Sequence, residues 1–220
     1  MRTVVFDLDG TLADTSADLL AAANACFREL GHGDMLDAGD TLTAFHGGRA
    51  MLRLGFSRLQ GYSEADVDLQ YPVLLAAYAR AIDTHTTLYP GSLTAILALR
   101  DAGFALAICT NKPAGLAETL TRNLGIRNYF GALIGADTLP QRKPDPAPLL
   151  EAIARVGGDP SRALLIGDTQ TDRDTGRAAK IPVVLVTFGP EGSGVARMQP
   201  EALLHHFDDL PGLVQQMLGR

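Results

Sequence analysis

The alternation of short apolar runs with helix-like stretches is the feature that most restricts the fold of this chain. Runs with the length and composition of buried strands lie at Thr3–Phe6, Phe104–Cys109, Ala132–Ile134, Ala163–Ile166 and Val183–Val186. Helix-like stretches separate most of these runs and stop at glycines, as the stretch 147–156 does before Gly157. This alternation predicts an α/β fold built on a parallel sheet. The tail from Ala202 is expected to add an edge strand and a last helix over 210–218.

The segment from Thr15 to Asp83 departs from the alternation, because it shows only helical periodicity. Its helix-like stretches are Ala17–Leu30, Arg49–Leu59 and Glu64–Ile82. Pro72, within the third stretch, predicts either a kink or two shorter helices. We therefore expect two domains: a core made of residues 1–14 and 84–220, and an inserted all-helical domain of residues 15–83.

Charge and composition exclude several classes of protein. The net charge of −6 comes from scattered acidic residues, whereas a nucleic-acid-binding protein needs a clustered basic face. No apolar run approaches the roughly 18 residues of a membrane span, and the N-terminus lacks the pattern of a signal peptide. Cys26 and Cys109 lie in apolar runs, which predicts buried, reduced thiols. We expect a cytoplasmic monomer or homodimer that binds a small molecule, with neither nucleic acid nor a membrane as a partner.

Polar residues follow four of the predicted strands, three times directly after the strand and once, at 142–144, in the loop that comes after it. They form four motifs: Asp7–Leu12, Thr110–Pro113, Arg142–Pro144 and Gly167–Asp172. Ligands of open parallel sheets bind at the carboxyl ends of the strands. The four motifs are therefore expected to converge on one crevice.

An Asp-x-Asp pair directly follows the first predicted strand. Asp7 and Asp9 are two residues apart in an extended segment, so their side chains are expected on the same side. That spacing suits one carboxylate that attacks phosphorus and a second that protonates the leaving oxygen. Gly10 allows a sharp turn, and Thr11 is placed to hold the carboxylates by hydrogen bonding. An isolated pair of this kind is commonly a turn, but the three other motifs favour the catalytic interpretation.

Two further motifs supply hydrogen-bond donors and positive charge. Thr110 and Asn111 stand between a strand and the start of a helix, where exposed N–H groups bind anions, so a phosphate is expected there. Lys143, which Pro144 holds extended, is placed to neutralise a phosphoryl group and the acidic residues. Lys112 either contacts a substrate anion or lies on the surface or behind the site.

The acidic residues of these motifs predict a metal site. Asp168 ends the apolar run 163–167, and Asp172 lies one helical turn later. Several carboxylates repel a phosphate dianion unless a hard divalent cation lies between them, and Mg²⁺ suits oxygen ligands. We expect the side chains of Asp7 and Asp168 to bind this ion. The carbonyl of Asp9 would be a third ligand, and Asp172 would bind directly or through water.

Together, the four motifs resemble those of the haloacid dehalogenase-like phosphohydrolases. The resemblance rests on DLDGT at 7–11, TN at 110–111, the lysine at 143 and GDTQTD at 167–172, and it covers essentially the whole chain. It implies a Rossmann-like, doubly wound parallel core with a helical C1-type cap at residues 15–83. It also implies that Asp7 is the nucleophile, that Asp9 is the general acid and then the base, and that Mg²⁺ is the cofactor.

Within this family the chain looks most like phosphatases of small metabolites. DGTLADT, TNKP and YPG carry a likeness to phosphoglycolate phosphatases, which makes phosphoglycolate the best single candidate substrate. The segment 45–50 resembles the family's substrate-specificity loop, where Gly48 and Arg49 are expected to contact the substrate. Arg49 and His46 are equally compatible with positions on the surface of the cap.

Several relatives with other activities can be compared on the same residues. Enzymes that break carbon–halogen bonds lack the second aspartate that Asp9 supplies here. Phosphonoacetaldehyde hydrolases need a cap lysine for a Schiff base, and residues 15–83 contain none. A sugar phosphomutase of the β-phosphoglucomutase type shares the aspartate pair and remains the main alternative. A non-catalytic binding protein is a weaker one, because binding alone needs no nucleophile and acid.

Overall fold

The computed structural model describes residues 1–219 and divides the chain into two compact units. One unit comprises Met1–Asp14 and the chain from Leu88 onward, and the other comprises Thr15–Thr87. Within residues 1–219, every helix falls short of the length and apolar character that crossing a membrane requires.

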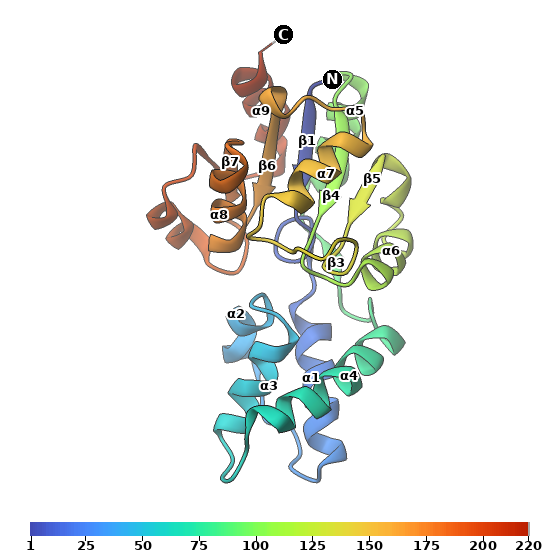
Figure 1. The fold of residues 1–220 in the computed structure, drawn as a ribbon, viewed down its shortest axis with the longest axis vertical. Helices are drawn as coiled ribbons and strands as arrows, with labels where there is room; N and C mark the ends of the chain where they lie inside the picture. The colour runs from blue at the N-terminus through green and yellow to red at the C-terminus, as the bar shows by residue number, and fades with distance from the viewer. Residues whose placement is uncertain (220) are drawn as a thin grey trace. The chain divides into compact units, whose positions relative to one another are not determined.

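The first unit is built on a parallel sheet of six strands (Figure 1). The strands are β1 (Thr3–Phe6), β4 (Ala105–Cys109), β5 (Ala132–Ile134), β6 (Ala163–Gly167), β7 (Val183–Val186) and β8 (Ala202–Leu204). Their spatial order is β5-β4-β1-β6-β7-β8, and Phe6 pairs in register with Ile108 of β4 and Ile166 of β6. The chain thus winds outward from β1 in both directions, which confirms the predicted Rossmann-like α/β fold. The carboxyl ends of β4, β1 and β6 consequently lie side by side.

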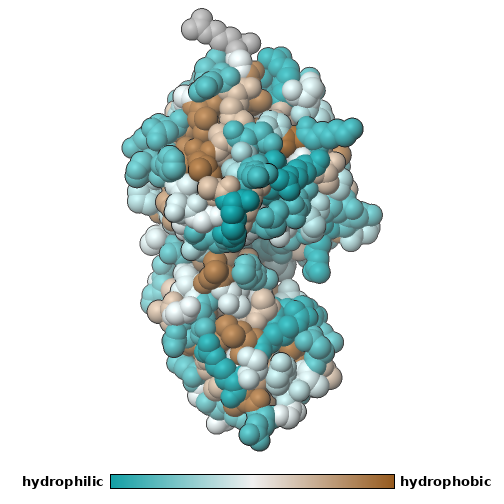
Figure 2. All heavy atoms as spheres, turned by 90° about the vertical axis from the view of Figure 1, so that its left-hand side faces the viewer, coloured by the Kyte–Doolittle hydropathy of each residue, from teal (hydrophilic) through white to brown (hydrophobic). Residues whose placement is uncertain are grey.

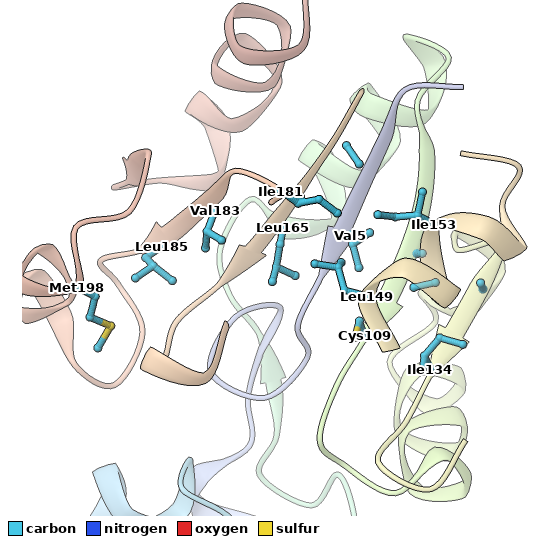
Figure 3. Close-up of a cluster of buried hydrophobic side chains, with 14 of the residues drawn as sticks. Val5, Cys109, Ile134, Leu149, Ile153, Leu165, Ile181, Val183, Leu185 and Met198 are labelled. Atoms are coloured by element: carbon cyan, nitrogen blue, oxygen red, sulfur yellow. The ribbon is translucent and has the colours of Figure 1, made fainter. Parts of the chain in front are cut away.

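Helices cover both faces of the sheet. The helices of this unit are α5 (Ser92–Asp101), α6 (Ala114–Asn123), α7 (Ala147–Arg155), α8 (Gln170–Ala179) and α9 (Leu210–Leu218). Short 3-10 turns lie at Arg127–Tyr129, Pro160–Arg162, Gly192–Met198 and Phe207–Asp209. α7 and α8 pack together over β1, β4, β6 and β7, where Figure 3 shows Val5, Leu149 and Leu165 among the buried side chains. Val4 and Phe6 point to the other face and are also fully buried.

The second unit, Thr15–Thr87, is helical. It contains α1 (Ser16–Glu29), a 3-10 turn at Ala38–Asp40, α2 (Thr41–Ala44), α3 (Gly48–Ser57) and α4 (Glu64–Arg80). α1 packs against α3 and α4, and the rings of Phe27 and Phe56 meet edge to face at 5.1 Å. Gly55 permits this contact, because a Cβ there would lie 2.2 Å from the ring of Phe27. α4 continues through Pro72 as one helix, so the alternative of two shorter helices was wrong.

The boundary at the end of the helical unit lies at Thr87, four residues beyond the predicted residue 83. Two strands of two residues each, β2 (Ala13–Asp14) and β3 (Thr87–Leu88), form a separate small sheet. The buried carboxylate of Asp18 in α1 accepts the N–H groups of His85 and Thr86 at 2.9 and 2.8 Å. These bonds attach residues 84–87 to α1, and nothing in the apolar periodicity of the sequence signals them.

Most of the side chains that the sequence predicted to be buried lie in the interior of the protein. Cys26 and Cys109 are both fully buried free thiols, as predicted. A few large apolar side chains are exposed, and Leu69 is the most exposed of them at 71%. On the face that Figure 2 shows, apolar residues are interrupted by polar ones over both units.

We expect the substitution Lys180→Gly to stabilise the protein. α8 ends at Lys180 in the left-handed conformation, with φ 58° and ψ 37°, where a side chain clashes with its own backbone and glycine does not. The free energy of unfolding should rise by about 0.5–1 kcal/mol in urea titrations, after the larger unfolded-state entropy of glycine is allowed for. Lys180→Ala removes the same charge but keeps the Cβ, so it should leave stability nearly unchanged. Equal stability of the two variants would contradict this account.

Candidate active site

Asp7 is held rigidly at the end of β1. Its N–H donates to the carbonyl of Ile166 at 2.9 Å, which extends the ladder with β6 by one residue. Its Oδ1 accepts the N–H of Leu8 at 2.7 Å, and the loop then turns at Gly10, where φ is 80°. The other oxygen, Oδ2, lies 2.9 Å from Nζ of Lys143. Backbone and side chain together therefore point one carboxylate oxygen of Asp7 at a cation.

Lys143 joins Asp7 to Asp172. Its Nζ also lies 2.7 Å from Oδ1 of Asp172, and the side chains of Lys143 and Asp172 are 2% and 0% exposed. Oδ2 of Asp172 accepts the hydroxyl and the N–H of Thr169 at 2.7 and 3.1 Å, which caps the first turn of α8. Asp172 thus uses one oxygen to fix its own helix and the other to hold the lysine.

Asp168 completes an acidic cluster with an oxygen that has no partner. Its Oδ1 accepts the hydroxyl of Thr11 at 2.7 Å, the kind of bond predicted for that threonine. Its Oδ2 is buried and has no hydrogen-bond partner within residues 1–219. Oxygens of Asp7, Asp168 and Asp172 all lie within 4.8 Å of one another. A buried carboxylate oxygen without a donor, beside two other carboxylates, fits a hard divalent cation.

The acidic cluster is electrostatically costly without such a cation. Burial raises the pKa of the Asp7 carboxyl to about 6, with Lys143 opposing the shift and Asp172 adding to it. Burial, together with the neighbouring carboxylates, raises the pKa of Asp168 well above its usual value. Burial alone would lower the pKa of Lys143, but the charges of Asp172 and Asp7 outweigh it, so the pKa of that ammonium lies above its ordinary value. The lysine therefore stays charged, whereas the raised pKa values of Asp7 and Asp168 make these two carboxyls bind protons more readily than ordinary ones.

Asp9 forms an ion pair with a second lysine, Lys112. Nζ of Lys112 lies 2.7 and 3.0 Å from the two carboxylate oxygens of Asp9. The side chain of Lys112 is 3% exposed and that of Asp9 is 19% exposed. The sequence left the place of Lys112 open between a substrate contact and a position on the surface or behind the site. The structure buries it against Asp9.

The Thr110–Asn111 motif lies beside Lys143. The N–H of Thr110 donates to Ile134 at 2.9 Å, and its hydroxyl accepts the N–H of Lys112 at 3.2 Å. The side-chain amide of Asn111 donates to the carbonyl of Lys143 at 3.0 Å, a contact that the sequence did not reveal. The docking of a phosphate on this motif stays a prediction.

The predicted substrate contacts of the specificity loop lie in the helical unit. Arg49 forms an ion pair with Asp68, its guanidinium stacks 4.5 Å from the centre of the Tyr71 ring, and its side chain is 40% exposed. A Cβ at Gly48 would lie 3.0 Å from the side chain of Leu74, so Gly48 packs against α4. His46 is exposed. Roles of these residues in substrate binding stay predictions.

Gly189, in the loop after β7, is a residue that the sequence analysis did not assign to the site. A Cβ there would lie 2.7 Å from the carbonyl oxygen of Gly10 and 3.3 Å from Cβ of Asp168. The loop therefore packs directly on the backbone that carries the acidic residues. A glycine just past the end of a strand, on the same edge of the sheet, was the available signal.

Comparisons with known proteins show the family of this chain. The family model described as haloacid dehalogenase-like hydrolase matches residues 4–186, so the chain belongs to this family, as the resemblance implied. A phosphoglycolate phosphatase of Mesorhizobium japonicum is 41% identical over 94% of this chain and 92% of its own. One of Agrobacterium fabrum is 34% identical over 98% and 94%. The chain is thus a hydrolase of this family, and both of these relatives are named phosphoglycolate phosphatases.

Solved structures support the fold. A crystal structure from Haemophilus somnus, described as a predicted phosphoglycolate phosphatase, has a TM-score of 0.86 and 24% identity and covers 98% of both chains. A structure from Thermotoga maritima with a β-phosphoglucomutase description has a TM-score of 0.74 and 20% identity, covering 99% and 100%. At these identities the likeness shows the fold alone.

We expect Mg²⁺ to stabilise the protein more at pH 7.5 than at pH 5. The pKa of Asp7 is raised in the fold, so the stability that its protonated form provides is complete below about pH 4 and is lost as the pH rises through about 6. A cation that replaces the protons restores this stability only where the carboxyls ionise. The melting temperature should rise on the order of 5 °C with millimolar Mg²⁺ at pH 7.5, and clearly less at pH 5.

The matched variants are Asp168→Asn, which should abolish the effect, and Asp174→Asn on the exposed part of α8, which should keep it. An equal rise in melting temperature at both pH values, or a full rise in Asp168→Asn, would rule out a cation held by this cluster.

Proposed function

We propose that this protein is a Mg²⁺-dependent phosphatase that hydrolyses a small phosphate monoester through an aspartyl-phosphate on Asp7. The observation that carries the proposal is the placement of Asp7. One of its oxygens lies 2.9 Å from the buried Nζ of Lys143, next to a carboxylate oxygen of Asp168 that has no partner in the described chain. A nucleophile, an ammonium group and a carboxylate oxygen that is available to a cation thus lie close together.

The residues around this point suit a bound cation. We propose that the side chains of Asp7 and Asp168 and the carbonyl of Asp9 hold Mg²⁺. Asp172 is already bonded through both oxygens, which favours its contact through water. When bound, the ion supplies neutralisation of charge on the phosphoryl oxygens.

The reaction proceeds in two steps that the protein's own residues carry out. An oxygen of Asp7 attacks phosphorus and the bond from phosphorus to the alcohol oxygen breaks, while the carboxyl of Asp9 gives its proton to that oxygen. A water molecule then attacks the phosphorus of the acyl phosphate, giving one proton to the Asp9 carboxylate. The bond to Asp7 breaks and its electron pair returns to the carboxylate. Lys143 offsets the charge of the phosphoryl group in both steps.

Phosphoglycolate is the substrate that we propose first. The curated relatives quoted above carry that activity in their names, at 34–41% identity and over nearly the full length of the chain. We also propose that the helical unit acts as a cap, with Arg49 as the residue that binds the substrate's carboxylate. The side chain of Arg49 is 40% exposed, so part of its guanidinium remains accessible beside the Asp68 pair.

A sugar phosphomutase remains the second candidate, because a chain with that description shares the fold. Product analysis separates the two reactions. A phosphatase releases inorganic phosphate from glucose 1-phosphate or phosphoglycolate, whereas a mutase returns an isomeric sugar phosphate.

We expect Asp7→Asn to lose at least about 1000-fold in kcat, because an amide oxygen cannot form the acyl phosphate. Release of phosphate from p-nitrophenyl phosphate and from phosphoglycolate measures the loss, and circular dichroism checks the fold. Asp174→Asn makes the same chemical change at an exposed position and should retain full activity. Appreciable turnover by Asp7→Asn would remove the nucleophile assignment.

We expect Arg49→Ala to raise KM for phosphoglycolate about 10- to 100-fold, the usual effect of losing a charge-assisted contact of about 1.5–3 kcal/mol. Hydrolysis of p-nitrophenyl phosphate, which has no carboxylate, should change little. Arg53→Ala provides the control, since Arg53 lies on the same helix, pairs with Glu64 and is also exposed. Equal effects on both substrates would count against a specificity role for Arg49.

A further inference from the structure

Lys112 occupies a place that the proposed chemistry has not yet used. Its ammonium lies 2.7 and 3.0 Å from the two oxygens of Asp9, so it contacts both carboxylate oxygens rather than one. The side chain is 3% exposed, which leaves its nitrogen little surface for a substrate anion. Both features favour a partner of Asp9 over a substrate contact.

The backbone of Lys112 is fixed on both sides. Its N–H donates to the hydroxyl of Thr110 at 3.2 Å, and its carbonyl accepts the N–H of Ala136 at 3.0 Å. The first bond ties it to the end of β4, and the second ties it to the segment that follows β5. The long side chain therefore starts from a fixed point of the backbone, which limits the positions that its ammonium can reach.

The two buried lysines contact different carboxylates. Lys143 contacts Asp7 and Asp172, and Lys112 contacts Asp9. Four carboxylates, with Asp168 included, and two ammonium groups leave two negative charges, which one divalent cation matches. Lys112 thus offsets the charge of Asp9, while Lys143 offsets charge on Asp7 and Asp172.

We propose that Lys112 is a positioning residue, which holds the carboxylate of Asp9 in the orientation that both proton transfers need. This inference rests on the proposed function. A bond to each oxygen resists rotation of the carboxylate and keeps it from turning toward the cation site or Lys143. Without the ammonium, Asp9 keeps its proton-transfer chemistry but loses its fixed direction, and a misplacement near 1 Å costs up to about 100-fold in rate.

The test is a double-mutant cycle between Lys112→Met and Asp9→Asn. Methionine keeps an unbranched side chain of similar length and removes the charge. With p-nitrophenyl phosphate and with phosphoglycolate, Lys112→Met should lower kcat about 10- to 100-fold while KM changes less than about twofold. In the Asp9→Asn background the same substitution should have little further effect. A rise of KM for phosphoglycolate alone, or effects that simply add, would overturn the proposal in favour of a substrate contact.

Two further variants separate positioning from folding. Lys180→Met makes the same change at the lysine that ends α8 and should leave kcat unchanged. Lys112→Arg keeps the charge and should retain more kcat than Lys112→Met at an equal melting temperature. If Lys112→Met does not fold, Lys112→Arg takes its place in the double-mutant cycle. Additive effects in that cycle would again overturn the inference. An inactive wild-type protein, or an active Asp7→Asn variant, would refute the proposed function itself. Normal wild-type activity with additive effects would refute the inference about Lys112 alone.

Discussion

The contact of Lys143 with Asp7 and Asp172 is the interaction on which the rest of the site depends. The side chains of Lys143 and Asp172 are 2% and 0% exposed and that of Asp7 is 12% exposed. Isolated charges that are buried in this way would be strongly destabilising. The ammonium makes the two carboxylates compatible with each other, and the carboxylates keep the lysine protonated. Removing the lysine would leave two buried carboxylates without a compensating charge. The ammonium of Lys143 thus also restrains the segments that carry Asp7 and Asp172.

The order of the strands brings this contact about. β1 lies between β4 and β6, so residues separated by more than 100 positions in the sequence come out at one edge of the sheet. Local structure then refines the arrangement. The cap of α8 orients Asp172, the amide of Asn111 supports the carbonyl of Lys143, and Gly189 lets a further loop pack on the backbone of Gly10. Each of these contacts positions the candidate site indirectly, through the segments that carry its charged residues.

The site also shows how burial prepares an acidic cluster for a metal ion. Desolvation raises the pKa of Asp7 and of Asp168, and the charge of Lys143 does not fully offset this rise. An oxygen of Asp168 meanwhile has no donor among the described residues. A divalent cation resolves both problems, because it supplies charge and accepts that oxygen as a ligand.

The sequence by itself determined the sheet, the helical insertion and the identity of the four motifs. Strand-length apolar runs and helical periodicity are local properties, and the aspartates directly follow the strands that position them. Only the tertiary structure decided which lysine pairs with which aspartate. That Lys143 lies on Asp7 and Asp172 while Lys112 lies on Asp9 depends on side-chain directions set by strand order, loop turns and packing. The tie between Asp18 and residues 85–86, which extends the helical unit, is likewise a contact between distant segments and leaves no periodic pattern in the sequence.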